Sequence, residues 1–214
     1  MVFIPRQARR ILVNEQSGES PIRRLDELRD QAAWVLLGEP GAGKSRAVEI
    51  EAEETDGLCI SIAKFLSDDP DTHWQGKTLF LDGLDETRAS GGDSSVLLKV
   101  RAHLRKLGNP KFRIACRAAD WFGSTDSQAI GDASPDGQLV VFVLEPLNDQ
   151  EIQEILRQNH AIPDPEGFVE KACERGIDGL LHNPQTLRLM AEAIRDGDWP
   201  NSRQETFELA CKKL

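Results

Sequence analysis

The clearest chemical signal in the sequence is a glycine-rich run that fits the pattern G-x-x-x-x-G-K-[ST] in full. Glycines at this spacing let the backbone wrap a phosphate, with its N–H groups and the start of the following helix turned toward the negative charge. Lys44 should reach the β- and γ-phosphates, and the Ser45 hydroxyl should ligate Mg²⁺. The residues expected to contact a bound nucleotide here are Gly38, Glu39, Pro40, Gly41, Ala42, Gly43, Lys44, Ser45 and Arg46.

A second group of functional side chains follows the apolar run 78–81. Asp82 stands at the carboxyl end of this expected strand, where ligands bind in open α/β sheets, and it is the natural partner for a metal held by Ser45. Asp85 and Glu86 come in the next turn, where a carboxylate can orient or deprotonate an attacking water. The alternatives are a helix cap for Asp82 and a solvated turn for the other two. Three acids around one strand end, in a chain with a phosphate loop, favour the functional interpretation.

Strands and helices alternate around these motifs. Apolar runs predict strands at 33–37, 58–62, 78–81, 112–116 and 139–144, and helical periodicity appears at 46–54 and again from Ser94 or Ser95 to Leu107. Strands separated by helices are typical of a parallel sheet covered on both faces. We therefore predict an α/β fold, a P-loop NTPase with a parallel doubly wound sheet.

The pattern changes after Pro146, where only helices are expected. Asp164-Pro165 and Asn183-Pro184 each open a helix, and Ser202 with Glu205 forms a capping-box signature for a last one. That last helix meets no stop signal before the end of the sequence, which suggests continuation in a longer parent chain. The expected organisation is an N-terminal segment or linker at 1–32, an α/β core at 33–147 and a small, truncated all-helical subdomain at 148–214.

Composition limits the function classes. The 214 residues carry 26 Lys+Arg against 36 Asp+Glu, a net charge of −10, which argues against direct nucleic-acid binding. No apolar run approaches the about 20 residues of a membrane span, and the N-terminus lacks a secretory core, so we expect a cytoplasmic protein without membrane contact. The four cysteines and four histidines are scattered, which predicts buried thiols and no metal cluster. A small basic cluster, Arg6 with Arg9 and Arg10, is expected to be a solvated face.

The string Asp82-Gly83-Leu84-Asp85-Glu86 resembles the acidic motif of the NACHT group of STAND NTPases, which reads apolar strand, Asp, small residue, apolar residue, Asp-Glu. Arg117, at the end of the expected strand 112–116, is similar to that family's sensor arginine. The passage at 144–147 looks like the family's transition from NTPase core to helical subdomain. Asn183-Pro184 looks like the motif whose proline packs against adenine. The resemblance covers about residues 30–214.

The resemblance implies ATP or ADP with Mg²⁺ as cofactors and a role for each matching residue. Lys44 and Ser45 would handle phosphates and metal, and Asp82 would bind the metal. Catalysis would fall to Asp85 and Glu86 on the water and to Arg117 on the γ-phosphate, while Pro184 would close over the base.

The implied function is a slowly hydrolysing ATP switch in signalling or defence, whose nucleotide state controls subdomain arrangement and self-association or contact with other domains of the parent. The winged-helix, sensor and effector regions usual in STAND proteins do not fit in 214 residues. Two alternatives stay open: an AAA+-like motor, with Arg188 or Arg195 as a second sensor, and a scaffold that never hydrolyses its nucleotide. Arg88 is evenly balanced between a phosphate or interface role and a surface charge, and Trp121 is expected in the core.

Overall fold

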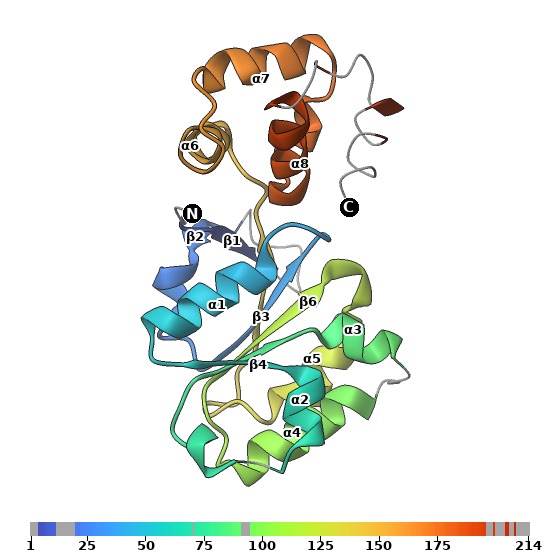
Figure 1. Cartoon of the computed structure of the whole chain (residues 1–214). Coiled ribbons are helices and arrows are strands. Elements are labelled where there is room, and N and C mark those ends of the chain that lie inside the picture. The colour runs from blue at the N-terminus through green and yellow to red at the C-terminus, as the bar shows by residue number, and fades with distance from the viewer. Residues whose placement is uncertain are drawn as a thin grey trace. The chain divides into compact units, whose positions relative to one another are not determined.

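The computed structural model describes residues 4–11, 20–69, 71–90 and 95–195, together with Trp199, Gln204, Glu205 and Glu208. The chain divides into two compact units (Figure 1). The α/β unit comprises Pro5–Pro40 and Lys44–Glu145, and the helical unit comprises the chain from Pro146 onward, with which Gly41–Gly43 and Ile4 are grouped. The boundary expected from the sequence falls two residues later. Most of the last expected helix, including Ser202, lies outside the described residues.

The α/β unit is built on a seven-stranded mixed sheet with the order β2-β1-β7-β3-β6-β5-β4. The strands from β3 to β7 are parallel, as the sequence predicts. Their bounds are β3 Ala33–Gly38, β4 Leu58–Ser61, β5 Leu79–Asp82, β6 Phe112–Arg117 and β7 Val140–Leu144. The strand β6 lies between β3 and β5, so the strands that carry the two motifs are separated by the strand that ends in Arg117.

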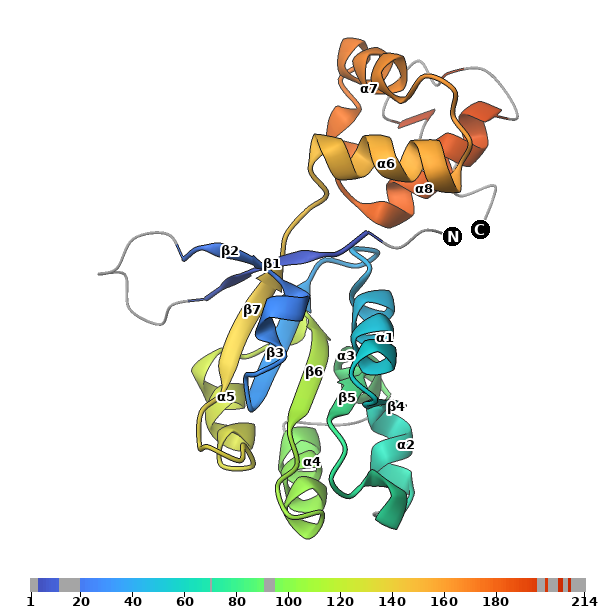
Figure 2. The same ribbon diagram turned by 90° about the vertical axis from the view of Figure 1, so that its left-hand side faces the viewer.

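Two short antiparallel strands extend the sheet beyond β7 (Figure 2). They are β1, Gln7–Arg10, and β2, Ile22–Arg24. Ala8 pairs with Leu144, so part of the region 1–32, expected as an N-terminal segment or linker, belongs to the sheet. The predicted solvated face is wrong for Arg6, which is buried and donates from Nη2 to the Glu145 carbonyl at 2.5 Å.

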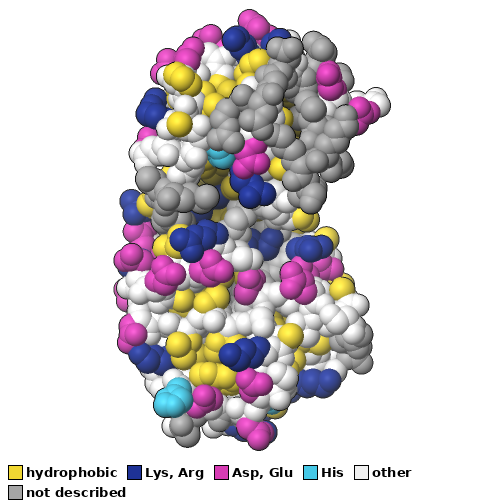
Figure 3. Space-filling view, viewed as in Figure 1, with side chains coloured by type: hydrophobic (Ala, Val, Ile, Leu, Met, Phe, Trp, Pro, Cys, Tyr) yellow, Lys and Arg dark blue, Asp and Glu magenta, His cyan; other side chains and the backbone are white. Residues whose placement is uncertain are grey.

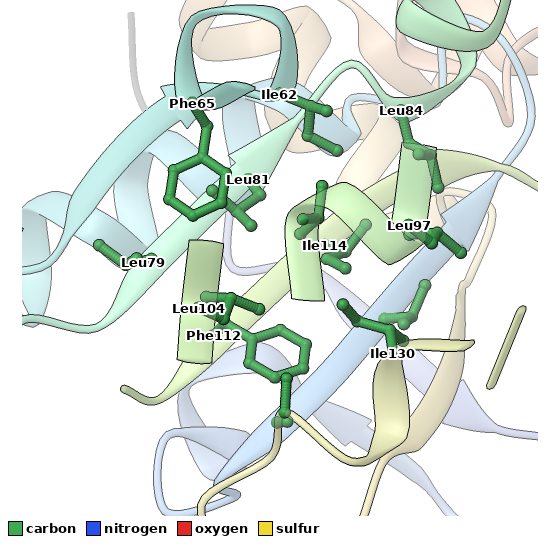
Figure 4. Close-up of a cluster of buried hydrophobic side chains, with 14 of the residues drawn as sticks. Ile62, Phe65, Leu79, Leu81, Leu84, Leu97, Leu104, Phe112, Ile114 and Ile130 are labelled. Carbon is green, nitrogen blue, oxygen red and sulfur yellow. The ribbon is translucent and has the colours of Figure 1, made fainter. Parts of the chain in front are cut away.

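Helices cover the sheet, and alternate side chains of its central strand face two different cores. Val35 and Leu37 belong to the cluster in Figure 4, whereas Trp34 makes edge-on ring contacts with Phe80 and Phe142. The helices of this unit are α1 Lys44–Glu54, α2 Ile62–Ser67, α3 Leu84–Ala89, α4 Ser95–Lys106 and α5 Ser124–Gly131, with short 3-10 turns at Leu25–Leu28, Thr72–Trp74 and Ala118–Asp120. The predicted apolar stripe from Leu97 to Leu107 is buried in the Figure 4 core, as is Trp121.

The helical unit consists of α6 Asp149–Asn159, α7 Pro165–Glu174, a 3-10 turn at Asp178–Leu180, and α8 Pro184–Arg195. Polar caps define where these helices begin. Asn148 and Glu151 form a reciprocal capping box, and Asp164 accepts from the Gly167 backbone N–H. The helices enclose a small core of their own. None of the helices in the described ranges is long and apolar enough to cross a membrane.

Candidate functional site

The phosphate-loop motif connects the end of β3 to the start of α1. Gly41 and Gly43 have φ angles of 74° and 89°, in the left-handed region that glycine tolerates. Lys44 Nζ donates to the carbonyl oxygens of Gly38, at 2.9 Å, and Glu39, at 3.0 Å, so the loop turns around the ammonium group. A Cβ atom on Gly38 would lie 3.4 Å from the Lys44 stem, at the edge of ordinary van der Waals contact, so the two residues pack directly against each other. The motif thus forms a tight glycine-containing loop around the Lys44 side chain.

The electrostatic surroundings of Lys44 connect the two motifs. Burial lowers the pKa of this ammonium group, and the negative charges of Asp85 and Asp82 oppose that shift. The carboxylates from the end of β5 thus act on the lysine that starts α1. Two further predicted residues, Ser45 and Arg46, are exposed, and Arg46 pairs with Glu49 at 3.2 Å on the helix surface.

A glycine in the left-handed backbone conformation connects strand β5 directly to helix α3 within the acidic motif. Asp82 is the last residue of β5, and its Oδ1 accepts from the Gly83 N–H at 2.9 Å. Gly83 has a φ angle of 78° and precedes α3, which Leu84 anchors in the core. Asp85 and Glu86 occupy the first turn of this helix. The alternative of a solvated turn is therefore wrong for Asp85, which is only 12% exposed, while Glu86 is exposed.

Arg117 ends β6 in register with the phosphate loop. It is the Cα partner of Gly38 across the β3–β6 pair. Its Nε lies 2.6 Å from Asp85 Oδ2, and 48% of its side chain is exposed. Two residues predicted to act separately, Asp85 on the water and Arg117 on the γ-phosphate, are thus paired with each other.

The cysteine next to Arg117 in the sequence, Cys116, has a buried thiol. Burial raises the pKa of this thiol to about 12, so it is neutral at ordinary pH. The predicted burial of thiols is wrong for Cys59 and Cys173, which are exposed, and Cys211 lies outside the described residues.

Arg88 is not the surface charge that the sequence left open as one alternative. It is buried against Asp126, to which Nη1 and Nη2 donate at 2.9 and 2.8 Å. Nη1 also donates to the Asp120 carbonyl, and the guanidinium lies 4.8 Å from the centre of the Phe122 ring. Asp126 accepts in addition from the Phe122 N–H at 2.8 Å. This network connects α3 to the segment after β6, and sequence spacing gave no signal for Asp126.

A Mg²⁺ ion fits these residues only together with a phosphate. Ser45 and Asp82 offer hydroxyl and carboxylate oxygens, the ligand types that Mg²⁺ prefers, and Mg²⁺ usually completes its shell with phosphate and water. Within the part of the chain that the structure describes, no group of three His, Cys, Asp or Glu side chains could hold a metal alone.

Several predicted residues belong to the other unit. Pro184 is the first residue of α8, and the Asn183 Oδ1 atom accepts from the Gln185 N–H at 3.0 Å. Arg188 lies exposed on the same helix. The proposed adenine contact of Pro184 stays a prediction, as does a sensor role for Arg188 or Arg195. Over the α/β unit, Figure 3 shows a row of separate basic side chains next to a row of acidic side chains.

Comparison with known proteins gives similarity of fold alone. No protein-family model matches the sequence, and no curated protein matches it. Among solved structures, domain III of the replication initiation protein DnaA from Thermotoga maritima is similar, with a TM-score of 0.49, 16% identity and 88% of each chain covered. A STAND protein (Signal Transduction ATPase with Numerous Domains) with a tetratricopeptide repeat sensor from Pyrococcus horikoshii is also similar, with a TM-score of 0.49 and 14% identity. That match covers 90% of this chain and 32% of that protein. Similarities this distant carry no argument about activity, which depends on the residues described above.

Proposed function

We propose that this chain binds ATP with Mg²⁺ at the carboxyl ends of β3, β5 and β6 and hydrolyses it slowly. The observation that carries the proposal is the convergence of Lys44, Asp85 and Arg117, which come from three separate elements around one end of a parallel sheet. This edge of an open α/β sheet is where such folds bind ligands. A phosphate cradle with a lysine, next to carboxylates and an arginine, provides what phosphoryl chemistry requires.

Each residue has a distinct part in this chemistry. The loop N–H groups and Lys44 would bind the phosphates, while Ser45 and Asp82 would hold Mg²⁺, which neutralises phosphate charge when bound. Glu86 is the candidate for orienting the attacking water, because its carboxylate is exposed at the first turn of α3. Arg117 can contact a terminal phosphate if it leaves Asp85.

The finer assignment is a NACHT-like STAND switch module, supported by the string Asp82 to Glu86 and by Arg117 at the strand end. In this role the nucleotide state would control the helical unit, with Pro184 against the base, and self-association or contact with other domains. An AAA+-like motor uses the same core elements. Nucleotide released from the purified protein separates the two: retained ADP supports a switch, and an empty site with rapid turnover supports a motor.

The direct test is nucleotide binding to the Lys44→Ala variant, measured by isothermal titration with ATP and Mg²⁺. Removal of a charged hydrogen-bond donor to phosphate should weaken binding by roughly tenfold to a hundredfold. Lys111→Ala is a matched control, because Lys111 is exposed and precedes β6 at the opposite end of the strands. Binding by Lys44→Ala equal to that of the parent would contradict the proposed function.

A further inference from the structure

The ion pair between Arg117 and Asp85 joins one fixed side chain to one that can move. Asp85 lies at the start of α3 and is 12% exposed, whereas 48% of the Arg117 side chain is exposed. Because water reaches and screens the half-exposed guanidinium, the pair contributes little free energy, and Arg117 can turn to another anion at low cost. Arg117 is therefore the partner that can exchange.

A second arginine–carboxylate pair on the same helix has the opposite character. Arg88 and Asp126 are 9% and 3% exposed and share two hydrogen bonds. Removing one partner of such a buried pair is costly, which makes exchange unfavourable. This pair keeps α3 attached to the segment after β6. Arg117 can consequently leave Asp85 without α3 having to move.

Resting on the proposed function, we propose that Asp85 competes with the terminal phosphate for Arg117 and so limits the preference for ATP over ADP. ADP lacks the phosphate that would replace the carboxylate, so its binding leaves the pair intact. ATP binding must break the pair before Arg117 can contact the γ-phosphate. Asp85 is then a positioning residue that acts through Arg117, and its predicted role on the water passes to Glu86.

Competition between Asp85 and the γ-phosphate predicts the direction and the size of a change in the ATP:ADP affinity ratio. Replacing the carboxylate by an amide in Asp85→Asn frees Arg117, so affinity for the triphosphate should rise more than affinity for ADP. The gain in the ATP:ADP affinity ratio should reach at most about fivefold, which is what an exposed ion pair can contribute. Loss of one negative charge near the phosphates also strengthens both ligands, so the ratio must be compared with and without the arginine.

The experiment is isothermal titration of the full chain with ADP and with a non-hydrolysable ATP analogue, both with Mg²⁺. The proteins are the parent, Asp85→Asn, Arg117→Gln and the double variant. Asp56→Asn is the matched control, because Asp56 is 91% exposed at the amino end of β4 and its positive φ suits asparagine. We expect a raised ATP:ADP affinity ratio in Asp85→Asn and a lowered ratio in Arg117→Gln. When Arg117 is absent, Asp85→Asn should leave the ratio unchanged. Asp56→Asn should match the parent.

An unchanged or lowered ratio in Asp85→Asn overturns the inference, and so does an equal rise in the Arg117→Gln background, which would reflect charge alone. Should Asp85→Asn fail to fold, Arg117→Gln decides independently: a ratio equal to the parent's overturns the inference. Failure of the proposed function gives a different result, since the parent would then bind neither nucleotide, or bind without any dependence on Lys44.

Discussion

The buried pair of Arg88 and Asp126 predicts a large loss of stability in Asp126→Ala. The substitution removes both carboxylate acceptors of the Arg88 guanidinium, which keeps only the Asp120 carbonyl, and it removes the acceptor of the Phe122 N–H. Arg88 would remain charged at 9% exposure without its carboxylate partner. Removing one partner of a buried ion pair costs about 3–5 kcal/mol. For a domain of this size, the melting temperature should fall by about 6–20 °C.

Urea unfolding followed by tryptophan fluorescence measures this loss, because Trp34, Trp74 and Trp121 are all buried in the α/β unit. Asp132→Ala is the matched control. Asp132 is 69% exposed and lies 3.6 Å from Arg105, so its loss should cost less than about 1 kcal/mol.

A double-mutant cycle tests whether the cost belongs to the pair. Replacing both partners, as in Arg88→Met with Asp126→Leu, removes the unpaired charge and should destabilise the protein less than the two single changes together. Additive effects, or a cost for Asp126→Ala no greater than for Asp132→Ala, would refute the interpretation of this pair as the fixed anchor of α3.

Three further predictions concern the site and the helical unit. Glu86→Gln should lower ATP turnover at least about a hundredfold while nucleotide binding persists, and turnover equal to the parent would remove Glu86 as the water-orienting residue. Because burial lowers the pKa of Lys44, nucleotide affinity should fall as pH rises through that lowered value, at a lower pH than an ordinary lysine would give. Lys44→Arg, whose side chain stays charged, should show no such alkaline loss in titrations between pH 7 and 10, and a matching loss would exclude Lys44 deprotonation. Asn148→Ala removes the capping box of α6 and should cost about 1 kcal/mol in urea unfolding, a change that would be undetectable if the cap is not needed.

The parallel strands could be predicted because each is an apolar run, and all of these runs except 58–62 end at a glycine or a charged residue. The run 33–37 ends before Gly38, and the run 112–116 ends before Arg117. The sequence therefore predicts both the strand and the functional residue at its carboxyl end. The position of β6 between β3 and β5 was not, because strand order depends on pairing between distant segments.

What the sequence did not reveal depends on partners far along the chain. The strand β1 is short and rich in arginine, and only its pairing with β2 and β7 identifies it as a strand. Arg113 lies within an apolar run yet is buried, because its guanidinium donates to backbone carbonyls of Arg29, Gln31 and Ala32. The pairing of Asp85 with Arg117 likewise joins residues that no local pattern relates.

The N-terminal strands have a practical consequence for any shortened version of this protein. A truncation that begins at β3 would leave the outer edge of β7 without its antiparallel neighbour and would remove the Arg6 bond to Glu145. An open, apolar strand edge pairs readily with the same edge of another molecule. Such a shortened chain should aggregate, and a light-scattering signal from it would reflect lost edge protection rather than nucleotide-dependent assembly.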